Sequence, residues 1–293
     1  MRSGQLTRAC AILVFTIAAS TVAVAKPVIP LKPASLWDIH YAPGSCLLLR
    51  EFGEGPNRVL VRFEQFAPSG EFELSLVGEP FRTKATVVDI TATFGPGGKP
   101  DRRKYAATGL LGDAEKRPLI VVGITTIVGR PPTKGRQEFK IAPALETAVN
   151  SLRVDVAGMP SALSLDLGSM GEPMKAMRAC TDELLDHWGL DAAAQRTLQR
   201  LPVPVTTPQR WFEATSYPDN AAGLNGYVHF RLTVDATGAV QDCAIPSATK
   251  GSVLAKATCE TLKRRARFKP AIDQSGKPVS SYYADTVRWY FLD

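Results

Sequence analysis

The sequence predicts an α+β protein with a β-rich N-terminal domain closed by a helix and a small C-terminal ββαβ domain. Three observations predict this class. Apolar and polar residues alternate through much of residues 46–167, a period of two that is typical of strands. The period becomes helical over Glu172 to Trp188. A proline-bearing spacer at residues 201–209 then precedes a second block of strand and helix patterns, residues 210–293.

The N-terminal domain is expected to span residues 37–200 and to consist mainly of strands. Turn residues at Pro68-Ser69-Gly70 and Pro96-Gly97-Gly98 separate some of the strand patterns. Seven segments alternate as strands do: Cys46–Phe52, Arg58–Phe66, Glu71–Val77, Ala85–Phe94, Leu119–Val128, Leu152–Val156 and Leu163–Leu167.

The predicted helix over Glu172 to Trp188 carries a stripe of apolar side chains. Its members recur at helical intervals: Met174, Met177, Leu184, Leu185 and Trp188. We interpret this stripe as a packing surface, because methionine and aromatic residues at such spacing usually face a core and seldom form a ligand groove. One helix therefore closes the β-rich domain.

The first 25 residues have the pattern of an export signal. Arg2 and Arg8 give a basic start, and the apolar run that follows is shorter than the roughly 20 residues of a membrane-spanning helix. Small residues at Ala23 and Ala25 predict cleavage between Ala25 and Lys26. We expect a periplasmic protein, with an uncleaved anchor in the inner membrane as the alternative.

Prolines at positions 27, 30 and 33 predict a stiff extended leader over residues 26–36, so the folded part is expected to begin at Trp37. The chain carries 35 Lys and Arg against 28 Asp and Glu, and cleavage would remove Arg2 and Arg8, leaving 33 against 28, a charge of +5. Because the basic residues are interspersed with acidic ones, no nucleic acid partner is expected.

Four cysteines remain after cleavage, Cys46, Cys180, Cys243 and Cys259, and they permit three pairings. Bridges Cys46–Cys180 and Cys243–Cys259 would each stay inside one predicted domain, the first joining a strand to the helix. We expect these two bridges as structural staples of an exported protein. A redox or zinc site would need closer spacing, such as CxxC, which this set lacks.

No pattern in the sequence indicates an enzyme. His40, His187 and His229 lie far apart, and none belongs to a metal-spaced pair or a nucleophile motif. The stretch Gly95-Pro-Gly-Gly98 lacks the lysine and helix start of a phosphate loop. We therefore predict no catalytic residue, no cofactor and no metal. His229 is expected on the strand face opposite the apolar one, in solvent or at an interface.

The C-terminal domain is predicted to have the order ββαβ. Residues 226–234 alternate as a strand, and Ala236-Thr237-Gly238 turns the chain into a second strand at 239–245. Ser252 is a suitable N-cap for a helix that runs to about Ala266. After a turn at Asp273-Gln-Ser-Gly276, a last long strand follows, with an apolar face of Val287, Trp289 and Phe291.

Several motifs in this domain point to one family. They are Tyr217-Pro218, Gly226, Asp235-Ala-Thr-Gly238 and Phe268-Lys-Pro270. Over roughly residues 208–293 the chain resembles the C-terminal domain of the TonB family of periplasmic energy transducers. The resemblance implies that the last strand, Tyr282 to Phe291, lies at a sheet edge and captures the TonB box of an outer-membrane transporter by strand addition.

The partner-binding surface implied by the resemblance is mainly the backbone of that strand. Its expected residues are Tyr282, Tyr283, Thr286, Arg288 and Tyr290. Such an edge would also allow two copies to pair, so a homodimer stays open.

Energy transduction is an open alternative. Energised members of the family keep an inner-membrane helix with a histidine that couples to a motor complex, and no histidine precedes His40. The spacer at 201–209 is also short. The competing prediction is a soluble periplasmic protein that captures or scaffolds peptides through the same edge, without a motor complex.

Overall fold

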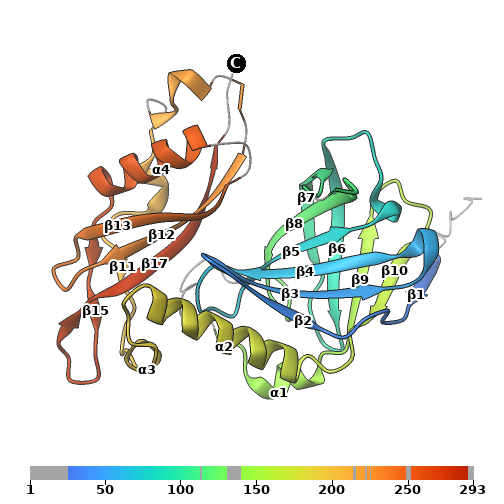
Figure 1. Ribbon diagram of the computed structural model, residues 1–293, viewed down its shortest axis with the longest axis horizontal. Coiled ribbons are helices and arrows are strands. Elements are labelled where there is room, and N and C mark those ends of the chain that lie inside the picture. Colours follow the sequence, from blue (N-terminus) through green and yellow to red (C-terminus); the bar gives the residue numbers. More distant parts are fainter. Residues whose placement is uncertain are drawn as a thin grey trace, which may run out of the picture.

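The computed structural model describes residues 26–112, 114–130, 140–213, 216–221, 223–224, 226–248 and 252–289. They form a large curled sheet with its helices and, beside it, a smaller sheet covered by one helix (Figure 1). This architecture confirms the predicted α+β class. Ala25, at the expected cleavage site, and Tyr290 and Phe291, in the expected edge strand, lie outside the described residues.

In the described part of the chain, ten strands form the large sheet in the order β1-β10-β9-β6-β7-β8-β5-β4-β3-β2. Neighbours are antiparallel except β1 and β10, which are parallel. The strands are β1 Val28–Leu31, β2 Asp38–Ala42, β3 Ser45–Phe52, β4 Val59–Gln65, β5 Phe72–Val77, β6 Val87–Gly95, β7 Asp101–Leu110, β8 Pro118–Thr125, β9 Ser151–Val156 and β10 Ala162–Asp166.

The expected leader is part of this fold, so the prediction that folding begins at Trp37 is wrong. β1 pairs with β10, and Leu31 is 4% exposed. Beyond β1 the chain reaches β3, where the Ala34 amide donates to the Glu51 carbonyl and the Gly53 amide to the Lys32 carbonyl. These bonds curl the sheet into a half-barrel. Proline fits β1 because an edge strand needs fewer amide donors.

Aromatic rings fill the interior of the half-barrel. Phe63 packs against Phe72 and Phe94, with ring centroids 4.4 and 5.9 Å away. Helix α2 (Gly171–His187) closes one end against β3 and β2, and the disulfide Cys46–Cys180 joins β3 to it. The predicted helix and its bridge to the first predicted strand are therefore both present.

Two short helices flank α2. They are α1 (Pro143–Ala148) and α3 (Ala192–Arg196). Glu146 of α1 is buried and accepts hydrogen bonds of 2.5 Å from Arg178 of α2, so its charge is paired inside the fold. Among the described residues, no helix is long and apolar enough to cross a lipid bilayer.

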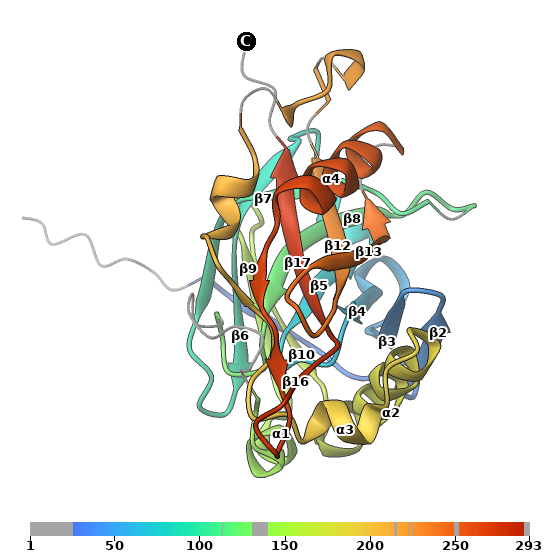
Figure 2. The same cartoon turned by 90° about the vertical axis from the view of Figure 1, so that its left-hand side faces the viewer.

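The smaller part has the predicted ββαβ order. Strands β12 (Gly226–Val234), β13 (Val240–Ala248) and β17 (Ser281–Trp289) form a sheet in the order β13-β12-β17, with α4 (Ser252–Arg265) over one face. Figure 2 looks onto this part, where β12 and β17 lie side by side. Two short ladders accompany it: β11 (Val203–Pro204) with β14 (Phe268–Lys269), and β15 (Ala271–Ile272) with β16 (Pro278–Val279).

The spacer at 201–209 does not run free between the two parts. Its β11 pairs with β14, and just before it the Gln199 amide donates to the Ile272 carbonyl. Trp211, just after it, is 1% exposed and packs on Phe268. The chain between the two sheets is thus held against the smaller part.

Candidate functional site

Strand β17 is the last strand of the small sheet, as the sequence predicted. It pairs with β12 along its whole length, from Ser281 opposite Val234 to Trp289 opposite Gly226. The Thr286 amide donates to the Asp285 carboxylate at 2.8 Å, which indicates that this N–H points away from β12. An added strand would form main-chain hydrogen bonds with the N–H and C=O groups on the outer side of an end strand.

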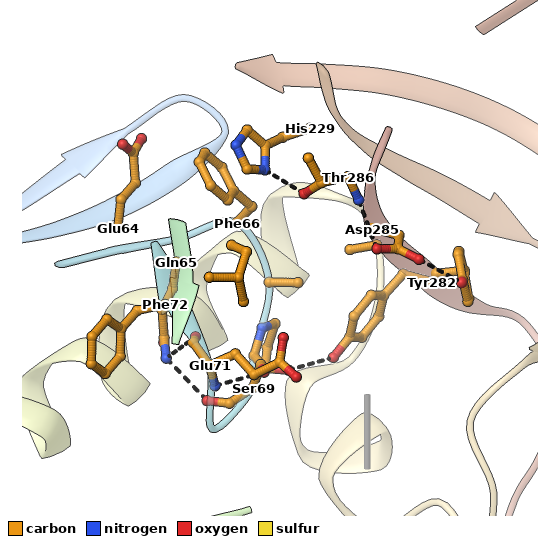
Figure 3. A pocket seen from close by; sticks show the side chains of 15 residues that line it. Glu64, Gln65, Phe66, Ser69, Glu71, Phe72, His229, Tyr282, Asp285 and Thr286 are labelled. Atoms are coloured by element: carbon orange, nitrogen blue, oxygen red, sulfur yellow. Dashed lines mark hydrogen bonds between the residues drawn. The ribbon is translucent and has the colours of Figure 1, made fainter. Parts of the chain in front are cut away.

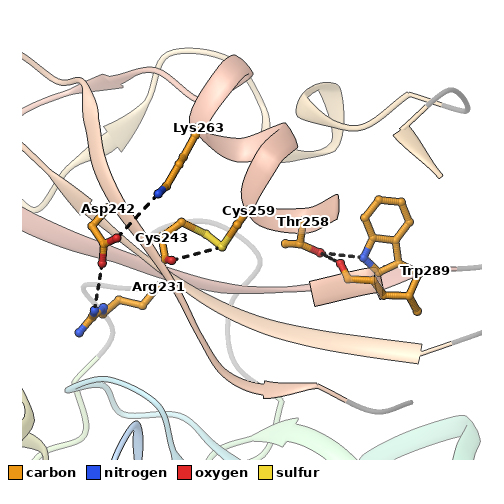
Figure 4. Close-up of a disulfide and its surroundings, with 8 residues drawn as sticks. Arg231, Asp242, Cys243, Thr258, Cys259, Lys263 and Trp289 are labelled. Atoms are coloured by element: carbon orange, nitrogen blue, oxygen red, sulfur yellow. Dashed lines mark hydrogen bonds and ion pairs between the residues drawn. A yellow bond between two sulfur atoms is a disulfide. The ribbon is translucent and has the colours of Figure 1, made fainter. Parts of the chain in front are cut away.

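The α4 face of β17 is a packed core. Tyr283 is 6% exposed and lies 5.0 Å from Phe268 and 5.7 Å from Trp211, ring centroid to ring centroid. Trp289 is also buried, and its indole N–H donates to the Thr258 hydroxyl at 2.9 Å (Figure 4). Tyr283, expected among the partner-binding residues, therefore has its side chain inside the domain.

The opposite face of β17 meets the N-terminal domain. The Tyr282 hydroxyl donates to the Pro68 carbonyl at 3.1 Å, and its ring lies 5.6 Å from that of Trp188, just after α2. Burial, and to a smaller extent the charge of Asp182, raises the pKa of Tyr282 above its ordinary value. Tyr282 is therefore an interdomain residue and only 5% exposed.

His229 lies at the centre of this interdomain contact (Figure 3). Its ring stacks on Phe66 at 4.0 Å between centroids, Nε2 lies 3.0 Å from Glu73 and Nδ1 lies 2.8 Å from the Thr286 hydroxyl. Both ring nitrogens thus have partners, and the side chain is 6% exposed. Of the two expectations for His229, solvent or interface, the structure shows the interface.

Two more charged groups lie close to the contact. Burial raises the pKa of Glu64, although the Ser45 hydroxyl, 2.7 Å away, opposes the shift by donating to the carboxylate. The Arg231 guanidinium lies 4.3 Å from the centre of the Trp188 ring, a cation–π contact between the domains. Burial lowers the pKa of Arg231.

The second expected disulfide, Cys243–Cys259, joins β13 to α4 (Figure 4). Next to it, Asp242 lies 3.7 Å from Arg231 and 3.9 Å from Lys263. The bridge holds the helix on the sheet at the strand farthest from β17, so it supports the sheet without occupying the end strand.

A cavity of about 100 Å³ lies between the two domains (Figure 3). Residues 282–286 of β17 and His229 of β12 line one side, and residues 64–69 with 71–72, at the β4–β5 hairpin, line the other together with Ile124. Thr286 borders this cavity, whereas Arg288 lies farther along β17, with its guanidinium 5.0 Å from the Tyr227 ring centre. The expected partner-binding residues therefore do not share one surface.

Sequence reasoning missed the N-terminal half of this site. Phe66 follows β4, Glu73 belongs to β5 and Trp188 follows α2. No local pattern linked these residues to β17, and Glu73 is 156 positions from His229. Within the described residues, His, Cys, Asp and Glu form no group of three placed to hold a metal ion.

Residues 213–291 match the family described as Gram-negative bacterial TonB protein C-terminal. The match covers β12, β13, α4 and β17, the elements that carry the resemblance seen in the sequence. Residues before 213 are not assigned to a family. Neither the curated proteins nor the solved structures gave a match to this chain.

Proposed function

From the premise that residues 213–291 are a TonB C-terminal domain, we propose that this protein works in the periplasm and binds an outer-membrane transporter segment by strand addition. The observation that carries the proposal is the sheet order β13-β12-β17, which leaves β17 at one end. An extended peptide laid along its outer side would gain main-chain hydrogen bonds, each worth about 1 kcal/mol net.

The amide of Thr286 is the natural contact for such a peptide. Its present acceptor is the carboxylate of the preceding residue, Asp285, a local interaction that a peptide carbonyl would replace. The core behind the strand is rigidly packed through Tyr283 and Trp289, so β17 has little conformational freedom to lose on binding.

A second candidate is peptide capture or scaffolding without energy transduction. The spacer favours this second candidate, because residues 199–211 are held on the small domain by β11, Ile272 and Trp211. The spacer therefore adds little length with which the small domain could extend away from the N-terminal domain. Energised transport would need a connection to an inner-membrane motor complex, through an anchor in residues 1–25 or through another protein.

The strand-addition proposal is tested by replacing Thr286 with proline in the full chain. Proline removes the outward amide, whereas Thr286→Ala removes the same hydroxyl contact with His229 and keeps the amide. The probe is a synthetic peptide spanning the TonB box of a transporter from the same organism, titrated calorimetrically. We expect at least tenfold weaker binding for Thr286→Pro and less than threefold for Thr286→Ala; equal affinities for the two variants would refute strand addition at this position.

A further inference from the structure

Strand β17 carries a single acidic residue, Asp285, and the carboxylate of this residue lies at the outer side of the strand. We propose that Asp285 sets the charge of the segment that β17 accepts, by selecting a lysine or arginine directly opposite it. This inference rests on the proposed function, because it assumes that β17 is the receiving strand. It adds a requirement on the partner segment that strand addition alone does not supply.

The pairing of β17 with β12 shows which backbone groups face outward. His229 lies opposite Thr286, and their side chains meet at 2.8 Å, as expected of an antiparallel pair that exchanges no backbone hydrogen bonds. The amide of Thr286 then points away from β12 and donates to the carboxylate of Asp285 (Figure 3). The carboxylate therefore lies where a carbonyl group of an added strand would approach Thr286.

Two hydrogen bonds hold the Asp285 carboxylate in this position. The Thr286 amide donates to Oδ1 at 2.8 Å, and the Tyr283 hydroxyl donates to Oδ2 at 3.0 Å. Tyr283 is itself fixed, because its ring is buried against Phe268 and Trp211. Tyr283 and Asp285 are two positions apart in one strand and so share the α4 face of the sheet. The carboxylate is therefore held at the outer margin of that face.

The residue paired with Asp285 on the inner side is apolar. It is Phe230 of β12, which is 3% exposed. An added strand would bring another residue to the outer side of Asp285, with the two Cβ atoms about 4.5–5.5 Å apart. Opposite charges in such a cross-strand pair stabilise a sheet, and like charges destabilise it. The residue opposite Asp285 is thus the one that its charge can select.

Strand addition also changes the hydrogen bonding of the carboxylate. A carbonyl group of the incoming segment takes the Thr286 amide, so the carboxylate loses that donor. A lysine or arginine opposite Asp285 supplies a charged donor in its place, and a charged donor makes a stronger hydrogen bond than a neutral one. A segment with an apolar or acidic residue there leaves the carboxylate with one donor fewer. Charged residues on end strands restrict pairing in this way.

The test separates the charge of Asp285 from its shape. The variant Asp285→Asn removes the charge and keeps an oxygen that can accept from the Thr286 amide. Its matched control is Glu260→Gln, which removes the same charge from an exposed position of α4, where Glu260 lies 3.8 Å from Lys256. Near-ultraviolet circular dichroism and intact native disulfides establish the folding of both variants before any titration.

The measurement is calorimetric titration of the full-length proteins with the same TonB-box peptide that tests strand addition. Each position of the peptide is replaced in turn by lysine and by glutamate, and the ratio of the two affinities is compared between proteins. At one position we expect lysine to bind at least fivefold more tightly than glutamate, both to the native protein and to Glu260→Gln. The same position should show less than a twofold preference in Asp285→Asn.

Two other outcomes would overturn the inference, and they are distinguishable. If Asp285→Asn leaves the ratio unchanged at every position while Thr286→Pro still weakens binding, Asp285 does not select the partner and strand addition stands. If the unmodified peptide does not bind, or binds Thr286→Pro and Thr286→Ala equally well, strand addition fails and this inference fails with it.

Discussion

Removing the two disulfides separately should destabilise the protein by different amounts. The bridge Cys46–Cys180 closes a loop with a sequence separation of 134, whereas Cys243–Cys259 closes one of 16. The entropy lost by the unfolded chain grows with the logarithm of loop length, which gives about 5 kcal/mol for the long loop and about 3 kcal/mol for the short one. We therefore expect the double variant Cys46→Ala with Cys180→Ala to lose about 2 kcal/mol more than Cys243→Ala with Cys259→Ala.

The assay is equilibrium unfolding in guanidinium chloride, followed by far-ultraviolet circular dichroism, for the native protein and both double variants. Alanine is used at both positions of each pair so that no free thiol remains. Because Cys46 and Cys180 are fully buried, the lost sulfur packing adds to the effect of the long loop. An equal or larger loss from the short bridge would refute the loop-length reasoning.

Three other predictions concern two carboxyl groups and the N-terminus. Burial raises the pKa of Glu64, so the stability that its protonated carboxyl group contributes is full at acidic pH and is lost as pH rises through the folded pKa. Glu64→Gln should therefore flatten the fall in stability above about pH 4.5, as measured by urea unfolding at a series of pH values. The Thr237 hydroxyl, with further hydrogen bonds, lowers the pKa of Asp235 to about 2, so the ionised carboxylate stabilises the folded protein. This stabilisation is lost as pH falls from about 4 to 2. The variant Asp235→Ala should lack this acid sensitivity, as measured by thermal unfolding against pH. N-terminal sequencing of protein from fractionated cells should begin at Lys26 in the soluble periplasmic fraction; an intact Met1 in the inner-membrane fraction would support the anchored alternative.

Local patterns predicted the elements that have one apolar face or a clear turn. The strands around Phe63 and Phe72, the helix with Cys180, and the ββαβ order of the last domain all follow from periodicity and turn residues. The pairing of four cysteines followed from keeping each bridge inside one domain, and both bridges are present.

Other features depended on contacts between distant segments. β1 has prolines that are typical of a leader, and only its pairing with β10 makes it a strand. β7 was missed because its sequence, Asp101-Arg-Arg-Lys-Tyr-Ala, is charged and lacks alternation, while its pairing with β6 and β8 supplies the order. Tyr282 was expected on a partner-binding surface, but it contacts the N-terminal domain instead. No local sequence pattern indicates that the N-terminal domain covers that face.

The bridge between β3 and α2 also limits how far the chain extends under tension. A pull on the two ends of the polypeptide passes through the sulfur–sulfur bond and bypasses the residues between Cys46 and Cys180. At about 3.5 Å per extended residue, the bond withholds on the order of 470 Å of chain from the applied force. The N-terminal domain would thus transmit force between the chain segments on either side of it with little extension, even after the hydrogen bonds of its sheet had begun to break.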